Sequence, residues 1–447
     1  MHIHRQPSWN HVSPIARALR LVFIALFPLI FSAVTSAQAP SSAPSKIDGL
    51  WDASVVVGSA EVPFNFEISS KNGQIQGFFF EGHKRIGSTS GRFVNNELQL
   101  QYEFLNSTLT ANFDGEQLQG TYRYNRKNGK EYAFHARRAQ PVRYETAFYP
   151  RVAADWEMKL VGDDKSPTKD PRSPLSWKLF LHREGQEIYG SILRIDGDTG
   201  TLTGHWQSNS LVLSHFAGER PVLFEAVLQP DGTLDVTYNR LNKYLAAPVT
   251  NARSKGIPEP PDPASFSSVK DASQPFQFQF SDLDGKLVSS ADEQFRGKVV
   301  LVNISGTWCP NCRDEAPFLV SLYKQYHSRG LEIVSLSFEA DGDPVKDKPR
   351  IASFISEFAI PYPVLLAGAI GEVPDKLPQI VGFDAYPTTL FLGRDGRVRT
   401  IHAGFASSAT GEASSALARE TRANIERLLS ESNAASTSTK ERKRSEE

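Results

Sequence analysis

Six prolines lie between residues 248 and 275, and the sequence pattern changes across this stretch. Proline fixes φ and has no backbone N–H, so closely spaced prolines such as Pro258, Pro260 and Pro261 favour extended backbone over the interior of a helix or sheet. We therefore predict a linker over residues 251–271. A boundary is also expected from the length of 447 residues, because domains of roughly 150 residues predict about two to four of them.

Before the linker, from about residue 46 to 245, the sequence is typical of strands. Short runs such as Phe64 to Ile68 alternate apolar and polar residues, and turn signals such as Lys71-Asn72-Gly73 separate them. A period of two is typical of strands that bury one face. We expect this region to be antiparallel and all-β.

The same region resembles itself. The segment from Trp51 to Gly77 is similar to the segment from Trp156 to Gly190. We predict a duplication with β-rich repeats at residues 46–140 and 150–250. The repeats form two small antiparallel sandwiches or barrels, or one larger sheet built from both copies.

After the linker, the sequence predicts alternating strands and helices. A helix is expected over 310–327, because Phe318, Leu322 and Tyr326 recur at every fourth position. The other expected elements are strands at 299–304, 331–338 and 362–366, helices at 350–358, 377–381 and 414–429, and a hairpin at 388–392 and 398–403. This order predicts an α/β domain over residues 272–430. The polar residues 431–447 are expected to be disordered.

The amino terminus predicts export. Arg5, Arg17 and Arg20 precede an apolar run over 21–34, which ends in small residues. This run is shorter than the roughly 20 residues that cross a bilayer. We predict a signal peptide over residues 1–39 and an extracytoplasmic, periplasmic protein, with an uncleaved membrane anchor as the alternative.

Composition excludes several classes of protein. Lys plus Arg number 49 against 50 Asp plus Glu, so no basic excess is available to bind nucleic acid. The two cysteines are too few for a disulfide-framed scaffold or a four-thiolate zinc site. We expect no cofactor, no metal and no nucleic acid partner.

The two cysteines stand in the sequence Trp308-Cys309-Pro310-Asn311-Cys312, after an apolar strand and at the start of a helix. A helix amino terminus stabilises a thiolate through its unpaired N–H groups and its dipole. Cys309 is therefore the predicted attacking sulfur, and Cys312, one turn later, resolves the mixed disulfide. Pro310 suits the first helical turn, where its missing N–H is no loss.

Three other interpretations of the pair are open. A structural disulfide across so short a loop stabilises by only about 2 kcal/mol, against nearly 5 kcal/mol for a loop of about 100 residues. A zinc site needs two further ligands from the ten histidines. A thiol peroxidase uses Cys309 alone, and peroxiredoxins carry a Thr three residues before the reactive Cys, where this chain has Gly306.

Four separate features carry a resemblance to a known family. They are the Trp-Cys-x-x-Cys motif after the strand at 299–303, Pro317 five residues after Cys312, the segment Tyr386-Pro387-Thr388-Thr389, and a leading hairpin over 278–288. With these features, residues 272–430 resemble the exported TlpA/ResA-type thiol-disulfide oxidoreductases of the thioredoxin fold.

The resemblance implies roles for several residues. It implies that Pro387 is cis and that its neighbour pairs with the backbone of a bound substrate, while Tyr386 and Trp308 shape the substrate-binding edge. It implies that Glu315 moves protons during exchange. Pro317 matches the proline that kinks the active-site helix.

Asn303 stands where thioredoxins proper carry a buried Asp, so the sequence favours the exported subfamily over a cytosolic thioredoxin. The resemblance also implies an enzyme that reduces disulfides of protein substrates and takes electrons from a membrane-embedded donor. An alternative is that the β region is a ligand-binding or partner-binding module and the redox domain is accessory. We favour the hypothesis that the β region is a module that recruits or orients substrates for a working redox domain.

Overall fold

The structure is a computed structural model that describes residues 45–126, 129–141, 154–165 and 175–431. The signal peptide predicted for 1–39 and the tail from 432 onward lie outside these residues. All described residues belong to one compact unit. Within these ranges, no helix combines the length and the apolar character needed to span a membrane.

The first repeat folds into an antiparallel sheet with the strand order β4-β3-β2-β1-β9-β8-β7-β6-β5. Its strands are β1 (Gly49–Val57), β2 (Ala60–Lys71), β3 (Gln74–Glu81), β4 (Lys84–Gly87), β5 (Ser90–Val94), β6 (Glu97–Tyr102), β7 (Ser107–Phe113), β8 (Gln117–Tyr124) and β9 (Glu131–Arg138). The sheet curls until β5 meets β3, where Gly91 leaves no room for a Cβ beside the carbonyl of Ile75. Aromatic side chains fill the inside of this first barrel, among them Trp51, Phe66 and Phe134.

The second repeat forms another antiparallel sheet, in the order β11-β10-β18-β17-β16-β15-β14-β12-β13. Its strands are β10 (Asp155–Leu160), β11 (Trp177–Glu184), β12 (Glu187–Arg194), β13 (Gly197–Asp198), β14 (Leu202–Gln207), β15 (Ser210–His215), β16 (Val222–Leu228), β17 (Leu234–Tyr238) and β18 (Asn242–Pro248). Because β11 also pairs with β12, the ring of strands closes. Trp156 is buried in this second barrel as Trp51 is in the first. The prediction of an all-β amino-terminal region is confirmed.

A loop of the second barrel enters the first. Phe216, in the connection between β15 and β16, is only 1 % exposed. Its ring lies 4.9 Å from the ring of Phe64 and 5.2 Å from that of Tyr122, measured between centroids. Two residues later, the carbonyl of Gly218 accepts a hydrogen bond from the Tyr122 hydroxyl at 2.8 Å. This loop of the second barrel therefore contributes to the aromatic core of the first.

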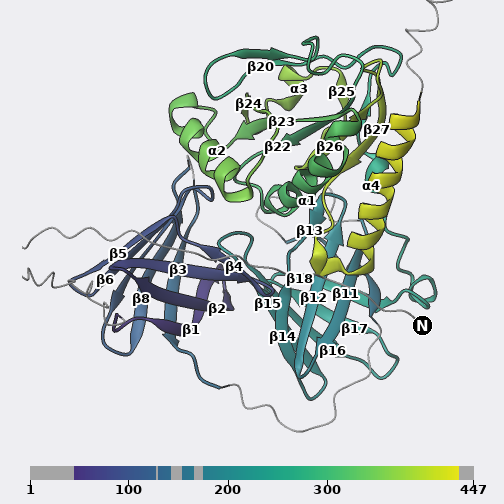
Figure 1. The fold of residues 1–447 in the computed structure, drawn as a ribbon. Helices are drawn as coiled ribbons and strands as arrows, with labels where there is room; N and C mark the ends of the chain where they lie inside the picture. Colours follow the sequence, from purple (N-terminus) through teal and green to yellow (C-terminus); the bar gives the residue numbers. More distant parts are fainter. Residues whose placement is uncertain (1–44, 127–128, 142–153, 166–174, 432–447) are drawn as a thin grey trace, which may run out of the picture. The chain divides into compact units, whose positions relative to one another are not determined.

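The C-terminal part, residues 268–430, is built around a sheet in the order β21-β20-β24-β23-β22-β26-β27 (Figure 1). Its strands are β20 (Gln279–Ser281), β21 (Leu287–Ser289), β22 (Val299–Ser305), β23 (Leu331–Glu339), β24 (Val364–Ala369), β26 (Thr388–Leu392) and β27 (Val398–Ala403). Its helices are α1 (Pro310–Tyr326), α2 (Pro344–Phe358), α3 (Val373–Lys376) and α4 (Glu412–Ser430). Strands β22, β23 and β24 are parallel, β26 is antiparallel to β22, and β27 is antiparallel to β26.

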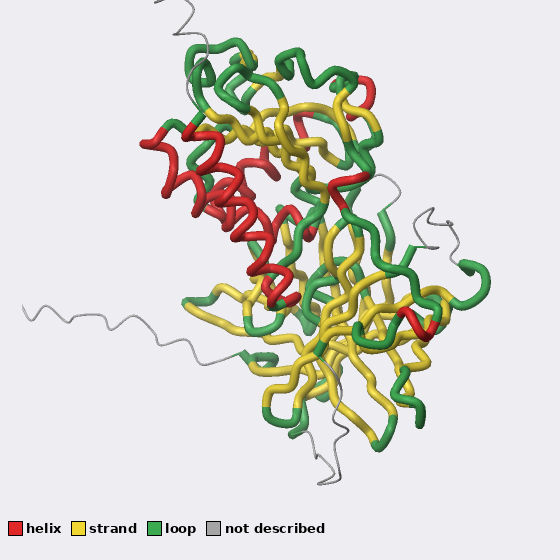
Figure 2. The backbone as a smooth tube through the Cα atoms, turned by 90° about the vertical axis from the view of Figure 1, so that its right-hand side faces the viewer, coloured by secondary structure: helices red, strands yellow, loops and turns green. Residues whose placement is uncertain are grey.

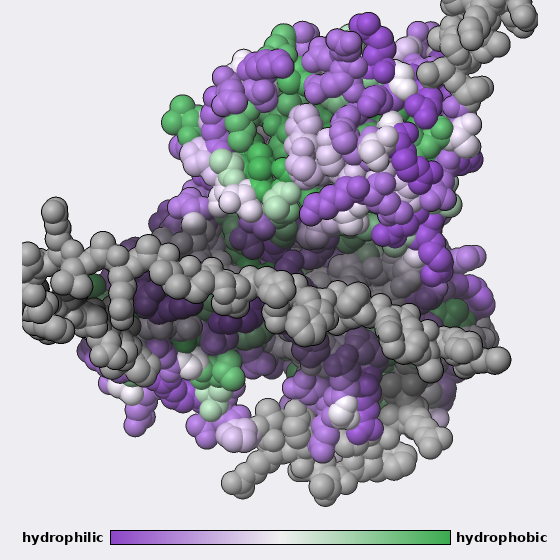
Figure 3. Space-filling model, in the orientation of Figure 1, coloured by the Kyte–Doolittle hydropathy of each residue, from purple (hydrophilic) through white to green (hydrophobic). Residues whose placement is uncertain are grey.

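The central strand β22 is buried on both faces, which explains its continuous apolar sequence. Leu301 packs with α1 and α4 on one face of the sheet. Val302 packs on the other face with the leading hairpin β20–β21 and with α3. In Figure 2, all the long helices belong to this part of the chain, while the barrels consist of strands and loops. Figure 3 shows that polar residues cover most of one face, with apolar residues between them over the C-terminal part.

This arrangement confirms the predicted α/β fold, with two local corrections. The short helix expected at 377–381 is wrong, because α3 spans only Val373–Lys376 and Ile380 and Val381 form strand β25 (Ile380–Val381). This strand pairs with β19 (Ser268–Val269), which comes from the end of the predicted linker. The short apolar run at 377–381 satisfied a helical and an extended pattern equally well, and pairing with a distant segment decided between them.

The second correction concerns α2, which begins at Pro344 rather than at residue 350. The side chain of Asp343 caps this helix by accepting a hydrogen bond from the Val345 N–H at 3.0 Å. In the structure, Pro349 lies inside α2, where its missing N–H leaves the carbonyl of Val345 without a helical partner. The predicted start at residue 350 therefore missed the turns before this proline.

Candidate active site

The two cysteines form a disulfide at the amino terminus of α1. Cys309 is the N-cap residue, and its Sγ accepts a hydrogen bond from the Cys312 N–H at 3.2 Å. The residues are 0 % and 3 % exposed, respectively. Because backbone N–H groups at a helix start favour negative charge, the reduced Cys309 sulfur is held where a thiolate is stabilised.

The Tyr386–Pro387 peptide bond is cis and lies beside the disulfide. The carbonyl oxygen of Tyr386 is 3.5 Å from Sγ of Cys309. The segment joins directly to β26, which pairs with the strand that leads to the cysteines. The structure thus brings Cys309 together with Tyr386 and Pro387, two of the three residues that the resemblance assigned to substrate binding.

Trp308 lies against the same segment. Its ring centroid is 5.1 Å from that of Tyr386, with the rings nearly perpendicular. Its indole N–H donates a hydrogen bond to the carbonyl of Phe338 at 2.8 Å. The indole is therefore fixed by both a strand end and the cis-proline segment, and forms one wall of the site.

Glu315 lies within α1, one turn after Cys312, with only 5 % of its surface exposed. Its carboxylate accepts hydrogen bonds from the Asn303 amide at 2.7 Å and from the Thr389 hydroxyl at 3.0 Å. Burial raises the pKa of Glu315 to about 7, although both hydrogen bonds act in the opposite direction. Residues three apart on a helix are neighbours, so this carboxyl and Cys312 share one face of α1.

Asn303 supports Glu315 from the central strand. Its amide nitrogen also lies within hydrogen-bond distance of the Thr389 hydroxyl, at 3.0 Å, and its oxygen accepts from Ser335 at 3.2 Å. An Asn at this position supplies a donor where an Asp would supply an acid. The one carboxyl of this buried network is therefore on α1 and not on β22.

Two prolines shape α1. Pro310 occupies its first position and Pro317 lies inside it. Because Pro317 has no N–H, the carbonyl of Arg313 has no helical partner at this point, which favours a bend. Both prolines lie in the helix that was expected from the sequence, Pro310 before Cys312 and Pro317 after it.

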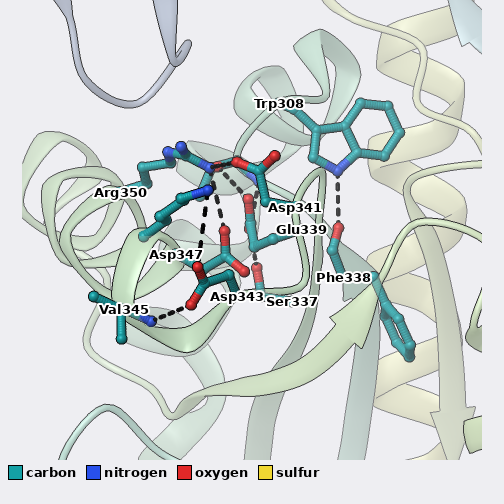
Figure 4. A network of polar contacts seen from close by, with 11 residues as sticks. Trp308, Ser337, Phe338, Glu339, Asp341, Asp343, Val345, Asp347 and Arg350 are labelled. Atoms are coloured by element: carbon teal, nitrogen blue, oxygen red, sulfur yellow. Dashed lines mark hydrogen bonds and ion pairs between the residues drawn. The ribbon is translucent and has the colours of Figure 1, made fainter. Parts of the chain in front are cut away.

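A buried glutamate that sequence reasoning missed holds the loop before the cysteines (Figure 4). Glu339, 1 % exposed, accepts hydrogen bonds from the backbone N–H of Thr307 at 3.0 Å and from its hydroxyl at 2.6 Å. The Ser337 hydroxyl donates to the same carboxylate at 2.6 Å. The acid-rich sequence from Glu339 to Asp343, directly after a buried strand, was the available signal.

Further carboxylates surround this glutamate, and one arginine pairs with two of them. Arg350 lies 2.8 Å from Asp341 and 3.2 Å from Asp347. Burial, together with the nearby negative charge of Glu339, raises the pKa of Asp347 to about 6. The side chains in Figure 4 point toward one another around Arg350 and fix the start of α2 next to the loop that carries Trp308.

The loop between β12 and β14 of the second barrel contacts the residue between the two cysteines. Asn311, 1 % exposed, donates a hydrogen bond from its amide to the carbonyl of Asp196 at 3.1 Å. Gly197, with φ of +112°, leaves no space for a Cβ beside the Asn311 amide. Asp198 accepts a hydrogen bond from the Ser407 N–H at 2.5 Å, and burial raises its pKa to about 6. No local motif predicted this contact.

Comparison with known proteins shows what the part of the chain that carries the cysteine pair is similar to. Residues 268–418 match the sequence model of the Redoxin family. Thiol-disulfide oxidoreductase ResA of Geobacillus thermodenitrificans is 31 % identical over 127 residues, which cover 28 % of this chain and 66 % of that protein. ResA of Bacillus subtilis is 29 % identical over 140 residues, or 30 % of this chain and 68 % of that protein.

Among solved structures, a thiol:disulfide interchange protein of the thioredoxin family from Chlorobium tepidum has 27 % sequence identity and a TM-score of 0.27. The alignment covers 35 % of this chain and 94 % of that one. The chain spans somewhat less than two thirds of the length of the first ResA relatives, between 62 % and 66 %.

The sheet, the disulfide at the start of α1 and the adjacent cis proline define the C-terminal part as a thioredoxin-fold thiol-disulfide oxidoreductase domain. Within that class, this part of the chain is similar in sequence to the ResA proteins.

Proposed function

We propose that the protein is an exported thiol-disulfide oxidoreductase that reduces disulfides of protein substrates. One observation carries the proposal. The Cys309–Cys312 disulfide lies at a helix start, next to a cis-proline segment and one turn before a buried carboxyl whose pKa is raised to about 7. Nucleophile, resolving thiol, peptide-docking edge and acid–base group are the parts that such an exchange needs.

The reaction starts from the reduced pair. The Cys309 thiolate attacks one sulfur of the substrate disulfide, a mixed disulfide forms, and the other substrate sulfur leaves as a thiolate. The Cys312 thiolate then attacks Sγ of Cys309, the mixed disulfide breaks, and the second substrate sulfur leaves. Two electrons pass to the substrate, and the enzyme ends in the disulfide state that the structure contains.

Glu315 takes the proton of Cys312 in the second step. A thiol is a poor nucleophile until it is deprotonated, and a base with a pKa near 7 both accepts and releases a proton at neutral pH. Asn303 and Thr389 orient the carboxylate through the hydrogen bonds described above. Trp308, Tyr386 and Pro387 form the edge on which the substrate backbone docks.

Electrons to restore the dithiol come from a membrane-embedded donor, and the signal peptide over 1–39 places the protein on the same side of the membrane. Amino-terminal sequencing of the exported protein checks this placement. A mature end near Pro40 supports it, and an intact Met1 contradicts it.

Trapping of the mixed disulfide tests the exchange directly. Cys312→Ser leaves Cys309 able to attack and removes the sulfur that resolves the product. We expect this variant to accumulate covalent adducts with disulfide-containing proteins, seen as bands on non-reducing gels that disappear with dithiothreitol. Cys309→Ser is the matched control and should form none.

The alternative functions predict different results. A thiol peroxidase consumes hydrogen peroxide at a rate that depends on Cys309 alone, and Cys312→Ser would then leave the first turnover unchanged. A merely structural disulfide would give no adducts in either variant. Either result would overturn the proposal.

We also propose that the barrels orient substrates for the redox pair. The contact between Asp196 and Asn311 supports this, since it brings the β12–β14 loop to the dipeptide that separates the cysteines. A protein substrate that reaches Cys309 meets this loop as part of the docking surface.

A further inference from the structure

Glu315 needs a route by which its proton reaches water, and the structure contains a small cavity beside it. The cavity has a volume of about 10 Å³ and lies between the sheet, α1 and α4. This is close to the smallest volume that holds one water molecule. Polar side chains in its wall include Glu315, Thr389, His402 and Thr421.

A second, larger cavity of about 280 Å³ adjoins the first. It is lined by residues of β26, β27, α4, the β12–β13 edge of the second barrel and the linker near Pro263. Five residues line both cavities, namely Phe391, His402, Phe405, Leu417 and Thr421. His402 is the one titratable side chain in this shared wall.

His402 is placed next to the partners of Glu315 by strand pairing. It lies on β27 directly opposite Thr389 on β26. Opposed residues in an antiparallel pair project to the same face of the sheet. Thr389 in turn donates its hydroxyl hydrogen to Glu315 at 3.0 Å. The imidazole and the Thr389 hydroxyl therefore lie side by side on the same face of the sheet.

The surroundings keep this imidazole neutral at pH 7. Burial lowers the pKa of His402, and the negative charge of Asp262 acts against that shift. The other ionisable groups around the two cavities are Glu315 from α1, Glu420 from α4, and Lys178 and Arg194 from the second barrel. A neutral imidazole accepts a proton at one ring nitrogen and releases one from the other.

We propose that His402 is a positioning residue that relays protons between Glu315 and the larger cavity. The inference rests on the proposed function, because it assigns a route to the proton that Glu315 takes from Cys312. In that step the Cys312 S–H bond breaks and the proton joins the carboxylate. The Glu315 O–H proton then moves through the small cavity to one ring nitrogen of His402, while the proton on the other ring nitrogen passes to the larger cavity.

The test is the rate at which the reduced full-length protein resolves its mixed disulfide with oxidised glutathione, measured by rapid acid quench at pH 7. We expect His402→Ala to slow resolution at least about tenfold, within the roughly 10²- to 10⁴-fold range of general acid–base effects. Added imidazole should restore the rate, because it enters the space that the side chain leaves. A loss of packing alone gives no such rescue.

Two further variants make the result decisive. His402→Gln keeps a polar side chain of similar reach but has no ring nitrogen that relays a proton. We expect it to slow resolution to the same extent as His402→Ala, and it serves as the test if His402→Ala folds poorly. His327→Ala is the matched control, because His327 is half exposed at the end of α1 and lines neither cavity. It should leave the rate unchanged.

The outcomes separate this inference from the proposed function. If Glu315→Gln slows resolution and neither His402 variant does, the relay is wrong and the role of Glu315 stands. If Glu315→Gln has no effect, the acid–base role itself is wrong. A structural role of His402 would give a third pattern: both His402 variants are slow, imidazole does not restore the rate, and the redox potential of the cysteine pair shifts. That pattern overturns the relay. In the double variant Glu315→Gln/His402→Ala, we expect no loss of rate beyond that of Glu315→Gln.

Discussion

Replacing Glu315 with Gln should remove a pH dependence from the stability of the oxidised protein. The carboxyl has a pKa of about 7 in the folded protein against an ordinary value of 4.5, and burial is the cause. Its folded pKa is raised, so its contribution to stability is highest below pH 4.5 and falls as the pH rises toward 7. Gln cannot titrate, so the variant lacks this loss.

The magnitude follows from the two pKa values. Each unit is worth about 1.4 kcal/mol, so the full loss above pH 7 is roughly 3 kcal/mol. Between pH 5 and pH 8, the wild type should lose roughly 2 to 3 kcal/mol more of its unfolding free energy than Glu315→Gln does. Hydrogen bonds that Gln makes or loses shift the difference by the same amount at both pH values and cancel.

The assay is urea unfolding of both proteins at pH 5 and pH 8 without reductant, with the C-terminal part followed by hydrogen exchange in β22 and β26. Glu357→Gln is the control, because Glu357 is an exposed glutamate on α2 and lies outside this buried network. If the difference between wild type and Glu315→Gln is the same at both pH values to within about 0.5 kcal/mol, Glu315 titrates normally and the reasoning is wrong.

Two other predictions concern the barrels. Phe216→Ala should lower the free energy of unfolding of the amino-terminal region by about 3 to 5 kcal/mol in urea, because the Phe216 ring fills part of the core of the first barrel. A loss below about 1 kcal/mol would contradict that packing. Gly197→Val strains a backbone of positive φ by about 1 to 3 kcal/mol, and its side chain clashes with the Asn311 amide. Because this displaces the loop that we propose orients protein substrates, the rate of insulin reduction should fall about fivefold or more. The rate of reduction of oxidised glutathione should stay unchanged. Equal loss with both substrates would argue against an orienting role.

Local patterns predicted the redox centre because its parts are encoded in short segments. The apolar strand before Cys309 and the proline in the first turn of α1 each follow from a few adjacent residues, while the cis Pro387 was expected from the resemblance of its segment to a known family. The same holds for β22, whose burial on both faces requires an uninterrupted apolar run.

The remaining features depend on contacts across long stretches of sequence. Asn311 and Asp196 are 115 residues apart, and Ser407 and Asp198 are 209 apart. The burial of Asp198 and Phe216 cannot be predicted from the hydrophobic pattern around them, because the residues that they contact lie in distant segments. Glu339 is intermediate, since acids after a buried strand are visible in the sequence but their hydrogen bonds to Thr307 are not.

The insertion of Phe216 makes the contact between the two barrels asymmetric. The second barrel supplies the inserted ring, and the first supplies the aromatic pocket that receives it. The two barrels are therefore not interchangeable. A chain with the two repeats exchanged in order, or with the first repeat expressed alone, would leave an aromatic-lined opening to water, and neither repeat can be regarded as an independent unit for engineering.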